Sequence, residues 1–293
     1  MAEPEADVPL ARLTTVRTGG AAEWFARAGS RRELLELLEW AGRRSLAVQV
    51  IGSGSNLLVA DEGVRGLVLK LERELARIDA DGSRGLRCGG GARLPAVAAR
   101  AATLGLAGIE FAVNIPGTVG GAVRMNANAY DGALAAVLDW VEIVSADGVS
   151  RRGPAELGFE YRRSALTAGE IVSRACFALE PGSPDAIRAT IASMRERRHA
   201  AQPKGIKTFG STFKNPPGGR TAGQLLAEAG AASLAVGGAR FSRKHANFVE
   251  NAGGASTADI VALMALGRER VLERFGIALE PEVELLGAVR LPW

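Results

Sequence analysis

The spacing of apolar residues along the chain predicts both helices and strands. Apolar positions that repeat every three or four residues predict helices, and shorter apolar runs bounded by turn residues predict strands. The predicted helices cover 31–43, 95–104, 184–200 and 257–275. The predicted strands cover 46–51, 67–71, 140–145, 149–152, 171–179 and 277–286. This mixture predicts an α+β protein.

Particular residues mark where the predicted helices begin and end. Ser30 and Glu33 have the spacing of a capping box in front of the first helix. Thr257 is the expected N-cap of the last helix, and Gly276 is its expected end. The ends of these two helices are therefore predicted to within a residue or two.

The length of the chain predicts more than one folding unit. A chain of 293 residues exceeds the usual size of a single core, so we expect two or three units of roughly 100 residues each. A turn-rich break at Pro181–Pro184 separates the strand-rich middle from a helix. The sequence therefore predicts three parts, at 1–75, 76–182 and 183–293.

Composition and charge exclude several classes of function. The net charge is only +4, and the 31 arginines are scattered among 32 acidic residues, so nucleic-acid binding is not indicated. No window approaches the ~18 uninterrupted apolar residues of a membrane span. The first residues are acidic and lack the order of a secretory signal, so we expect a cytoplasmic protein.

The sequence does not indicate metal or disulfide chemistry. Cys88 and Cys176 do not form a CxxC motif, and His199 and His245 have no neighbours at the spacing of metal ligands. We therefore expect no metal and no disulfide bond.

Two glycine-rich segments are the strongest sign of a ligand. Residues 114–123 read NIPGTVGGAV, and residues 52–56 read GSGSN after an apolar run. Glycine lets backbone amides approach and surround an anion such as a phosphate, so two such loops suggest a dinucleotide. Leu57 stands where the Rossmann fingerprint needs its third glycine, which excludes that motif. Each loop alone is more often an ordinary turn.

Further polar residues gather in three other segments. Residues 210–216 read GSTFKNP, but the sequence around Ser211 is not the GxSxG elbow of a hydrolase. Arg162 follows Tyr161 and could bind a carboxylate, although a surface arginine is the default. Strand alternation predicts that Glu282 shares one face with its acidic neighbours at 280 and 284, by default a solvated edge.

Read together, these segments resemble a known family. The chain is similar to the bacterial UDP-N-acetylenolpyruvoylglucosamine reductases (MurB) over nearly its whole length. The matching segments are GSGSNLLVADEG (52–63), NIPGTVGGAVRMNANAYDG (114–132), FEYRRS (159–164), GSTFKNP (210–216), AGQLLAEAG (222–230), SRKHANFVEN (242–251) and LEPEVELLG (279–287).

The resemblance implies a fold and a cofactor. The fold is the FAD-binding fold of the vanillyl-alcohol-oxidase (PCMH) type, with two FAD-binding subdomains at 1–75 and 76–182 and a C-terminal α/β substrate-binding domain at 183–293. FAD would be bound non-covalently, with the two glycine loops around its diphosphate. The implied cofactor-binding residues are Gly52, Ser53, Gly54, Ser55, Asn56, Leu57, Ile115, Pro116, Gly117, Thr118, Gly120, Gly121, Ala122 and Val172.

The resemblance also implies a reaction. NADPH would be the co-substrate, and a UDP-sugar enol ether would be reduced to UDP-N-acetylmuramate for peptidoglycan. Ser211 would donate a proton, while Arg162 and Glu282 would stabilise the enolic intermediate. The implied substrate-binding residues are Tyr161, Lys214, Asn215 and His245. Apart from these small molecules no partner is implied, and we expect a monomer.

The chain departs from the family pattern at a few positions. Asn114, Asn128 and Asp131 stand where relatives have glycine, and we expect them to keep a left-handed backbone, which Asn and Asp tolerate best. Ala201 stands in place of a lysine, so Lys204, Lys207 or a nearby arginine is expected to replace it. The short span from 164 to 171 resembles the subgroup that lacks an additional tyrosine loop.

Two other functions fit the same motifs. One is a flavin oxidase or dehydrogenase of the same fold that acts on another substrate. The other is a UDP-sugar-binding homologue without catalysis, because fold and motif do not by themselves prove turnover. Retention of Arg162, Ser211 and Glu282 together favours the reductase.

Overall fold

The computed structural model describes residues 3–293, which form two compact units. Unit 1 contains residues 3–6, 24–53 and 66–198. Unit 2 contains residues 7–23, 54–65 and 199–293. The chain therefore contributes several separate segments to each unit. The predicted division at 75/76 and 182/183 stays a prediction.

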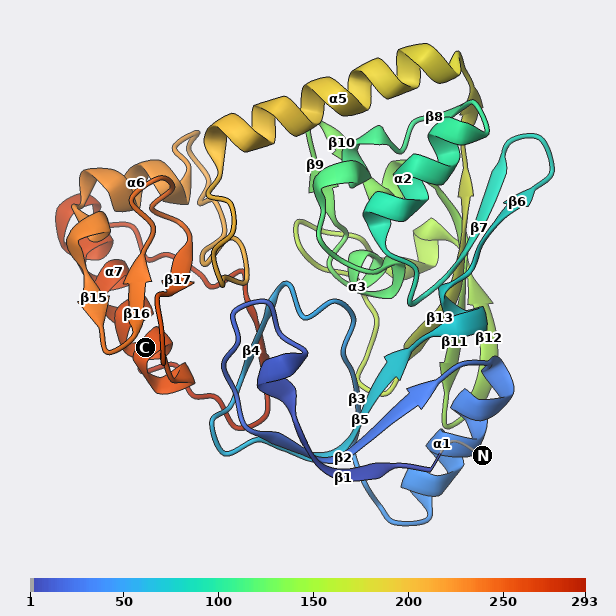
Figure 1. The fold of residues 1–293 in the computed structure, drawn as a ribbon, viewed down its shortest axis with the longest axis horizontal. Coiled ribbons are helices and arrows are strands. Elements are labelled where there is room, and N and C mark those ends of the chain that lie inside the picture. Colours follow the sequence, from blue (N-terminus) through green and yellow to red (C-terminus); the bar gives the residue numbers. More distant parts are fainter. Residues whose placement is uncertain (1–2) are drawn as a thin grey trace. The chain divides into compact units, whose positions relative to one another are not determined.

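A five-stranded antiparallel sheet is the centre of unit 1 (Figure 1). Its order is β12-β11-β13-β7-β6. The strands are β6 (Ile78–Asp81), β7 (Gly85–Gly89), β11 (Leu138–Ser145), β12 (Gly148–Arg152) and β13 (Ile171–Ala178). The last three confirm the strands predicted at 140–145, 149–152 and 171–179.

Three helices of unit 1 contribute to the core over this sheet (Figure 1). They are α2 (Leu94–Thr103), α3 (Val119–Arg124) and α5 (Pro184–Ala201). From α5, Ile187 and Ile191 are buried in that core, at the helical spacing predicted from the sequence. Pro95 lies in the first turn of α2, where its missing N–H costs no helical hydrogen bond.

A second sheet of four strands has the order β1-β2-β5-β3. Its strands are β1 (Glu5–Pro9), β2 (Ala21–Ala28), β3 (Val48–Val50) and β5 (Val64–Leu71). In unit 1, helix α1 (Arg31–Gly42) buries Leu34, Leu37 and Leu38. The Ser30 side chain accepts a hydrogen bond from the Glu33 amide, so the predicted cap is confirmed.

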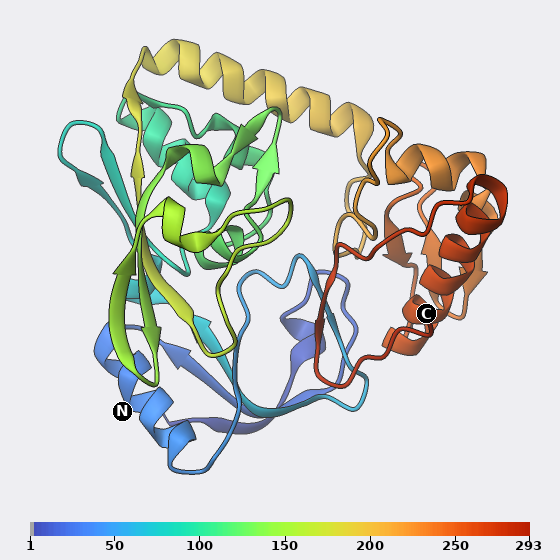
Figure 2. The same ribbon diagram turned by 180° about the vertical axis from the view of Figure 1, so that it is seen from behind.

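Unit 2 has a core of two helices and a small sheet (Figure 2). The helices are α6 (Ala222–Glu228) and α7 (Thr257–Phe275). The sheet strands are β15 (Ala235–Val236), β16 (Ala239–Phe241) and β17 (Val249–Asn251). A separate parallel pair joins β4 (Leu57–Val59) to β18 (Glu284–Leu286).

Short elements complete the fold. The remaining strands are β8 (Leu106–Ala107), β9 (Asn128–Ala129), β10 (Gly132–Ala133) and β14 (Glu180–Pro181), and the remaining α-helix is α4 (Leu134–Val137). Single 3-10 turns are η1 (Leu10–Arg12), η2 (Arg73–Ala76), η3 (Glu110–Asn114), η4 (Pro154–Leu157) and η5 (Ala231–Ser233). No helix of residues 3–293 has the length and apolarity to cross a membrane.

Two predictions at the C-terminal end are wrong in detail. The N-cap of α7 is Ser256 rather than Thr257, because the Ser256 hydroxyl accepts from the Asp259 amide. Thr257 is the first helical residue, and its hydroxyl donates to Val59 O (2.6 Å). The strand predicted at 277–286 is formed only at Glu284–Leu286, since only that part has a ladder partner in β4.

Candidate active site

Gly52, the first residue of one glycine loop, meets the other glycine loop within unit 1. A Cβ atom built on Gly52 would lie 2.5 Å from Thr118 Oγ1, so a side chain at position 52 would collide with the second loop. Gly52 follows β3, and Thr118 directly precedes α3. The sequence predicted both loops, and the structure places them in contact.

Most amides of the second loop are already bonded within the chain, so only a few of them can surround an anion as the glycines predict. Val119 N donates to Ala92 O (2.9 Å), and Gly120 N donates to Gly90 O (2.8 Å). Gly117 N is also used within the chain. Among residues 3–293, the amides of Thr118 and Gly121 have no acceptor. Only part of this segment is left to bind an anion.

The first loop has more amides to offer. None of the five amides of residues 52–56 has an acceptor within the described part of the chain. Gly54 has a φ of 62°, and a Cβ there would lie 2.1 Å from Leu13 O, so only glycine fits. Successive unbonded amides of this kind form a concave site for an anion.

Strand β13 packs closely against α3. A Cβ on Gly90 would lie 1.8 Å from Val172 O, and one on Gly120 would lie 3.4 Å from the same oxygen. The backbones of β13, α3 and the segment after β7 therefore touch without side chains between them. The predicted residue Val172 is itself buried.

In unit 2, the segments that carry Ser211 and Glu282 lie side by side. Glu282 N donates to Thr212 O (2.9 Å), and Phe213 forms an isolated antiparallel bridge with Pro281. The side-chain amide of Asn56 donates to Glu282 O (3.1 Å). Two of the three predicted catalytic residues are therefore brought together by neighbouring backbones.

Asn247 fixes the segment that follows Ser211. Its Oδ1 accepts from Phe213 N (2.9 Å), and its Nδ2 donates to Phe213 O (2.8 Å). Both Asn247 and Phe213 are buried. Sequence reasoning missed this residue, although it lies inside the SRKHANFVEN segment quoted above.

The predicted substrate residues of unit 2 also have structural partners. His245 Nδ1 accepts from Asn247 N (3.3 Å), and burial lowers the pKa of its imidazole. Asn215 Oδ1 accepts from Ala222 N (3.0 Å) at the start of α6. Lys214 lies 3.5 Å from the Glu280 carboxylate.

In unit 1, Tyr161 and Arg162 form the tip of a tight turn between Glu160 and Arg163. Arg162 Nη1 donates to Asn128 Oδ1 (2.8 Å), and its guanidinium lies 5.1 Å from the centre of the Tyr161 ring. Tyr161 is 47% exposed. An exposed ring beside an arginine is available to a ligand.

The expectation of a left-handed backbone at three family glycine positions holds only once. Asp131 has a φ of 64°, whereas Asn114 and Asn128 do not have positive φ. Their side chains make tertiary hydrogen bonds instead: Asn114 Nδ2 donates to Tyr130 Oη and Met194 O, and Asn128 accepts from Arg162. The amide side chains of Asn114 and Asn128 are therefore explained by these hydrogen bonds and not by a left-handed backbone conformation.

Neither cysteine is suited to nucleophilic chemistry. Cys88 and Cys176 are free and buried. Burial raises the pKa of the Cys88 thiol to about 12 and that of Cys176 to about 11. Both are therefore protonated near neutral pH, and a protonated thiol is a poor nucleophile. Within residues 3–293, no three His, Cys, Asp or Glu residues are grouped as metal ligands.

Comparisons with known proteins agree with this architecture. Residues 22–152 match the family model described as FAD binding domain, and residues 202–286 match that of the UDP-N-acetylenolpyruvoylglucosamine reductase C-terminal domain. The chain is 45% identical to UDP-N-acetylenolpyruvoylglucosamine reductase 2 of Symbiobacterium thermophilum, over 97% of this chain and 92% of that one. It is 44% identical to the reductase of Rubrobacter xylanophilus, over 96% and 94%.

A solved structure is similar over the full length. The crystal structure of UDP-N-acetylenolpyruvylglucosamine reductase (MurB) from Thermus caldophilus matches with a TM-score of 0.86 and 37% identity, covering 98% of this chain and 100% of that one. The fold, with its FAD-binding domain, thus defines an FAD-dependent oxidoreductase. The chain belongs to the UDP-N-acetylenolpyruvoylglucosamine reductase family, whose reaction contributes to peptidoglycan synthesis.

Proposed function

We propose that the loop 52–57 and the segment 115–122 bind the FAD diphosphate, and that NADPH is the reductant. The five unbonded amides of 52–56 carry this proposal, since a diphosphate supplies the acceptors that they lack. A side chain at Gly52 would collide with Thr118 and one at Gly54 with Leu13 O, so glycine is required at both positions of this loop. The residues present therefore fit the cofactor.

We propose that three side chains of the chain act on the enolpyruvyl group. FAD, when bound, supplies the hydride that is added to the methylene carbon of the enol ether. Negative charge then develops on the neighbouring carbon and on the attached carboxylate. The Arg162 guanidinium is suited to stabilise that charge, because a positioned cation acts most strongly where charge forms in a closed site.

Ser211 and Glu282 complete the proposed set. The Ser211 hydroxyl holds the proton that the carbon takes up, and the Glu282 carboxyl stabilises the enolic intermediate. Support comes from the backbone pairing of their segments, with Glu282 N bonded to Thr212 O. The paired backbones hold the segments of Ser211 and Glu282 in a fixed arrangement. A proton donor needs such positioning, because it must lie within reach of the atom that takes up the proton.

Tyr161, Lys214, Asn215 and His245 are the proposed contacts of the UDP-sugar. The ammonium of Lys214 is one-third exposed and suits a phosphate. Asn215 keeps its Nδ2 donor, because only Oδ1 is bonded to Ala222 N among the described residues. We assign the reaction to the cytoplasm, where its product serves cell-wall growth, cell shape and division.

Replacement of Ser211 by alanine tests the proposed proton donor. The purified protein is mixed anaerobically with NADPH and then with the enol ether, and flavin absorbance is followed in both steps. Ser211→Ala should keep flavin reduction and slow the recovery of absorbance by about 10²–10³-fold, the usual cost of removing such a donor. Ser233→Ala in unit 2, whose hydroxyl donates to Gly230 O, is the matched control.

Three results would count against the proposed function. Unchanged recovery in Ser211→Ala would remove the serine from the mechanism. Reduction by NADPH without recovery in the unmutated protein would exclude the enol ether as its substrate. Failure of the unmutated protein to bind FAD would contradict the cofactor site itself.

A further inference from the structure

Arg162 has an unfavourable backbone conformation. It has a φ of 58°, in the left-handed region, at the second position of the two-residue turn between Glu160 and Arg163. The two flanking residues pair through Glu160 N to Arg163 O (3.0 Å) and Arg163 N to Glu160 O (3.3 Å). Turns with positive φ at this position normally carry glycine. A side chain held there persists only where surrounding contacts enforce it.

The last residue of α3 and the residues directly after the helix supply those contacts. Asn126 Nδ2 donates to Glu160 O (3.0 Å), on one side of the turn. Asn128 Oδ1 accepts from Arg162 itself. Ser164 Oγ, on the other side of the turn, donates to Arg124 O (2.9 Å). The turn is therefore bound before, at and after Arg162 by the single segment 124–128.

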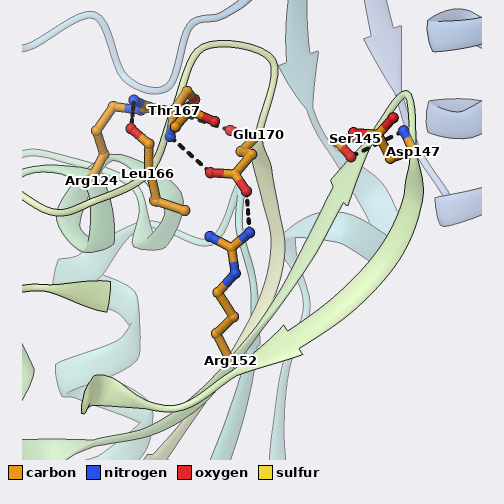
Figure 3. Close-up of polar contacts among 7 residues, drawn as sticks. All are labelled: Arg124, Ser145, Asp147, Arg152, Leu166, Thr167 and Glu170. Atoms are coloured by element: carbon orange, nitrogen blue, oxygen red, sulfur yellow. Dashed lines mark hydrogen bonds and ion pairs between the residues drawn. The ribbon is translucent and has the colours of Figure 1, made fainter. Parts of the chain in front are cut away.

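The Arg124 side chain binds the continuation of the same loop (Figure 3). Its Nη1 donates to Leu166 O (3.2 Å), and its Nη2 donates to Thr167 O (3.2 Å) and Glu170 O (3.0 Å). No carboxylate lies within ion-pair distance of Arg124 among the described residues. Its donors are thus directed at backbone carbonyls of 166–170.

Glu170 closes the loop from its other end (Figure 3). Its carboxylate accepts from Thr167 N (2.8 Å) and forms an ion pair with Arg152. Burial by itself raises the pKa of Glu170, but the hydrogen bonds from Arg152 and Thr167 lower it below its usual value. The acceptor is therefore ionised near neutral pH. The loop 164–170 is therefore bound to β12 through the Arg152–Glu170 ion pair and to α3 through the three hydrogen bonds of Arg124.

We propose that Arg124 is a positioning residue, which holds Arg162 in its strained turn and ties it to α3. This inference rests on the proposed role of Arg162 in the reduction. Helix α3 begins inside the glycine segment assigned to the cofactor, and a Cβ on its Gly120 would contact Gly90 and Val172. The Arg124 side chain thus ties the loop that follows Arg162 to the helix that begins in the cofactor segment.

The test uses Arg124→Met, which keeps the stem of the side chain and removes its donors. A displacement of about 1 Å in a catalytic group can cost about 10²-fold in rate. We expect enol-ether-dependent recovery of flavin absorbance to slow about 10- to 100-fold, with reduction by NADPH nearly unchanged. Arg124→Lys keeps a cation and should recover part of the rate.

Two further variants separate positioning from general damage. Arg151→Met is the matched control, because Arg151 lies over the Trp140 ring and does not contact the loop. In an Arg162→Ala background, Arg124→Met should cause little additional loss, since Arg124 acts through Arg162. Amide hydrogen exchange of residues 160–170 in the apoprotein should be faster in Arg124→Met and unchanged in Arg151→Met.

The outcomes distinguish the inference from the proposed function. If Arg162→Ala leaves recovery unchanged, the proposed role of Arg162 is wrong. If Arg162→Ala abolishes recovery but Arg124→Met has no effect, Arg124 is not a positioning residue. Additive losses in the double variant, or equal slowing of both half-reactions, would show a general structural role and overturn the inference.

Discussion

Replacement of Asn247 by alanine should destabilise unit 2 strongly. The side chain satisfies both backbone groups of Phe213, with bonds of 2.9 Å and 2.8 Å. Phe213 is completely buried, so water cannot replace these bonds. A buried polar group left without a partner costs about 1–3 kcal/mol, which gives about 4 kcal/mol for the pair. This is a large fraction of the ~5–15 kcal/mol that stabilises a typical domain.

Scanning calorimetry of the apoprotein measures this effect. At about 2–4 °C per kcal/mol for chains of this size, the midpoint of unfolding should fall by about 8–16 °C. Asn215→Ala is the matched comparison, because it removes a single, partly buried bond to Ala222 N at the start of α6. That loss should cost about 1 kcal/mol, as for other helix caps.

The comparison also tests which atoms of Asn247 matter. Asn247→Asp keeps an acceptor for Phe213 N but cannot donate to Phe213 O, so it should destabilise nearly as much as alanine. A loss below about 1 kcal/mol in Asn247→Ala, or equal losses at Asn247 and Asn215, would refute the view that buried backbone satisfaction dominates here.

Three other perturbations have defined outcomes. Gly52→Ala brings a methyl group against Thr118, so FAD should bind about tenfold more weakly in a fluorescence titration of the apoprotein; unchanged affinity would place the cofactor elsewhere. Asp61→Ala removes the acceptors of two amides at the start of α7, each at 2.9 Å, and should cost about 2–3 kcal/mol in denaturant unfolding; a loss no greater than an ordinary surface substitution would contradict this. Burial lowers the pKa of His245 in the folded protein below the 6.5 of the unfolded chain. As the pH drops below about 6.5, the unfolded chain is therefore protonated at His245 before the folded protein, and the free energy of unfolding should fall. His245→Gln should remove that slope and His199→Gln should keep it.

Local signals in the sequence predicted most of the regular elements. The helix at 31–43 was predicted from its apolar spacing and from Ser30, and both are confirmed in α1. Even there one contact differs, because the Glu33 carboxylate accepts from Gly29 N rather than from Ser30 N. Such patterns are readable because helix caps and turns depend on residues close in sequence.

Contacts between distant residues decided the predictions that were wrong. Thr257 has the chemistry of an N-cap, but its hydroxyl donates to Val59 O, and Ser256 caps the helix. Residues 277–283 have strand-like alternation but pair only through the isolated bridge between Pro281 and Phe213, whereas 284–286 form a ladder with β4. Asn114 is explained by hydrogen bonds to Tyr130 and Met194, not by its backbone angles. These partners are distant in the sequence, so the local sequence pattern around each residue does not predict them.

For the candidate site, too, some residues could be predicted from the sequence and others could not. Motif resemblance supplied Ser211, Arg162 and Glu282, because each lies in a quoted segment. The residues that hold these segments were missed, since Asn247 and Arg124 act through backbone atoms of other segments. A side chain that binds a carbonyl leaves no pattern in the sequence of its partner.

The composition of unit 2 has a consequence for protein synthesis. Its residues come from 7–23, 54–65 and 199–293. Asn251 Nδ2 donates to Val16 O across 235 positions, and β4 pairs with β18, the last element of residues 3–293. Segments 7–23 and 54–65 therefore cannot complete these contacts until β18 has been synthesised. Unit 2 is therefore expected to fold only after β18 has emerged from the ribosome, and a chain truncated before β18 should leave the apolar residues of β4 open to chaperones.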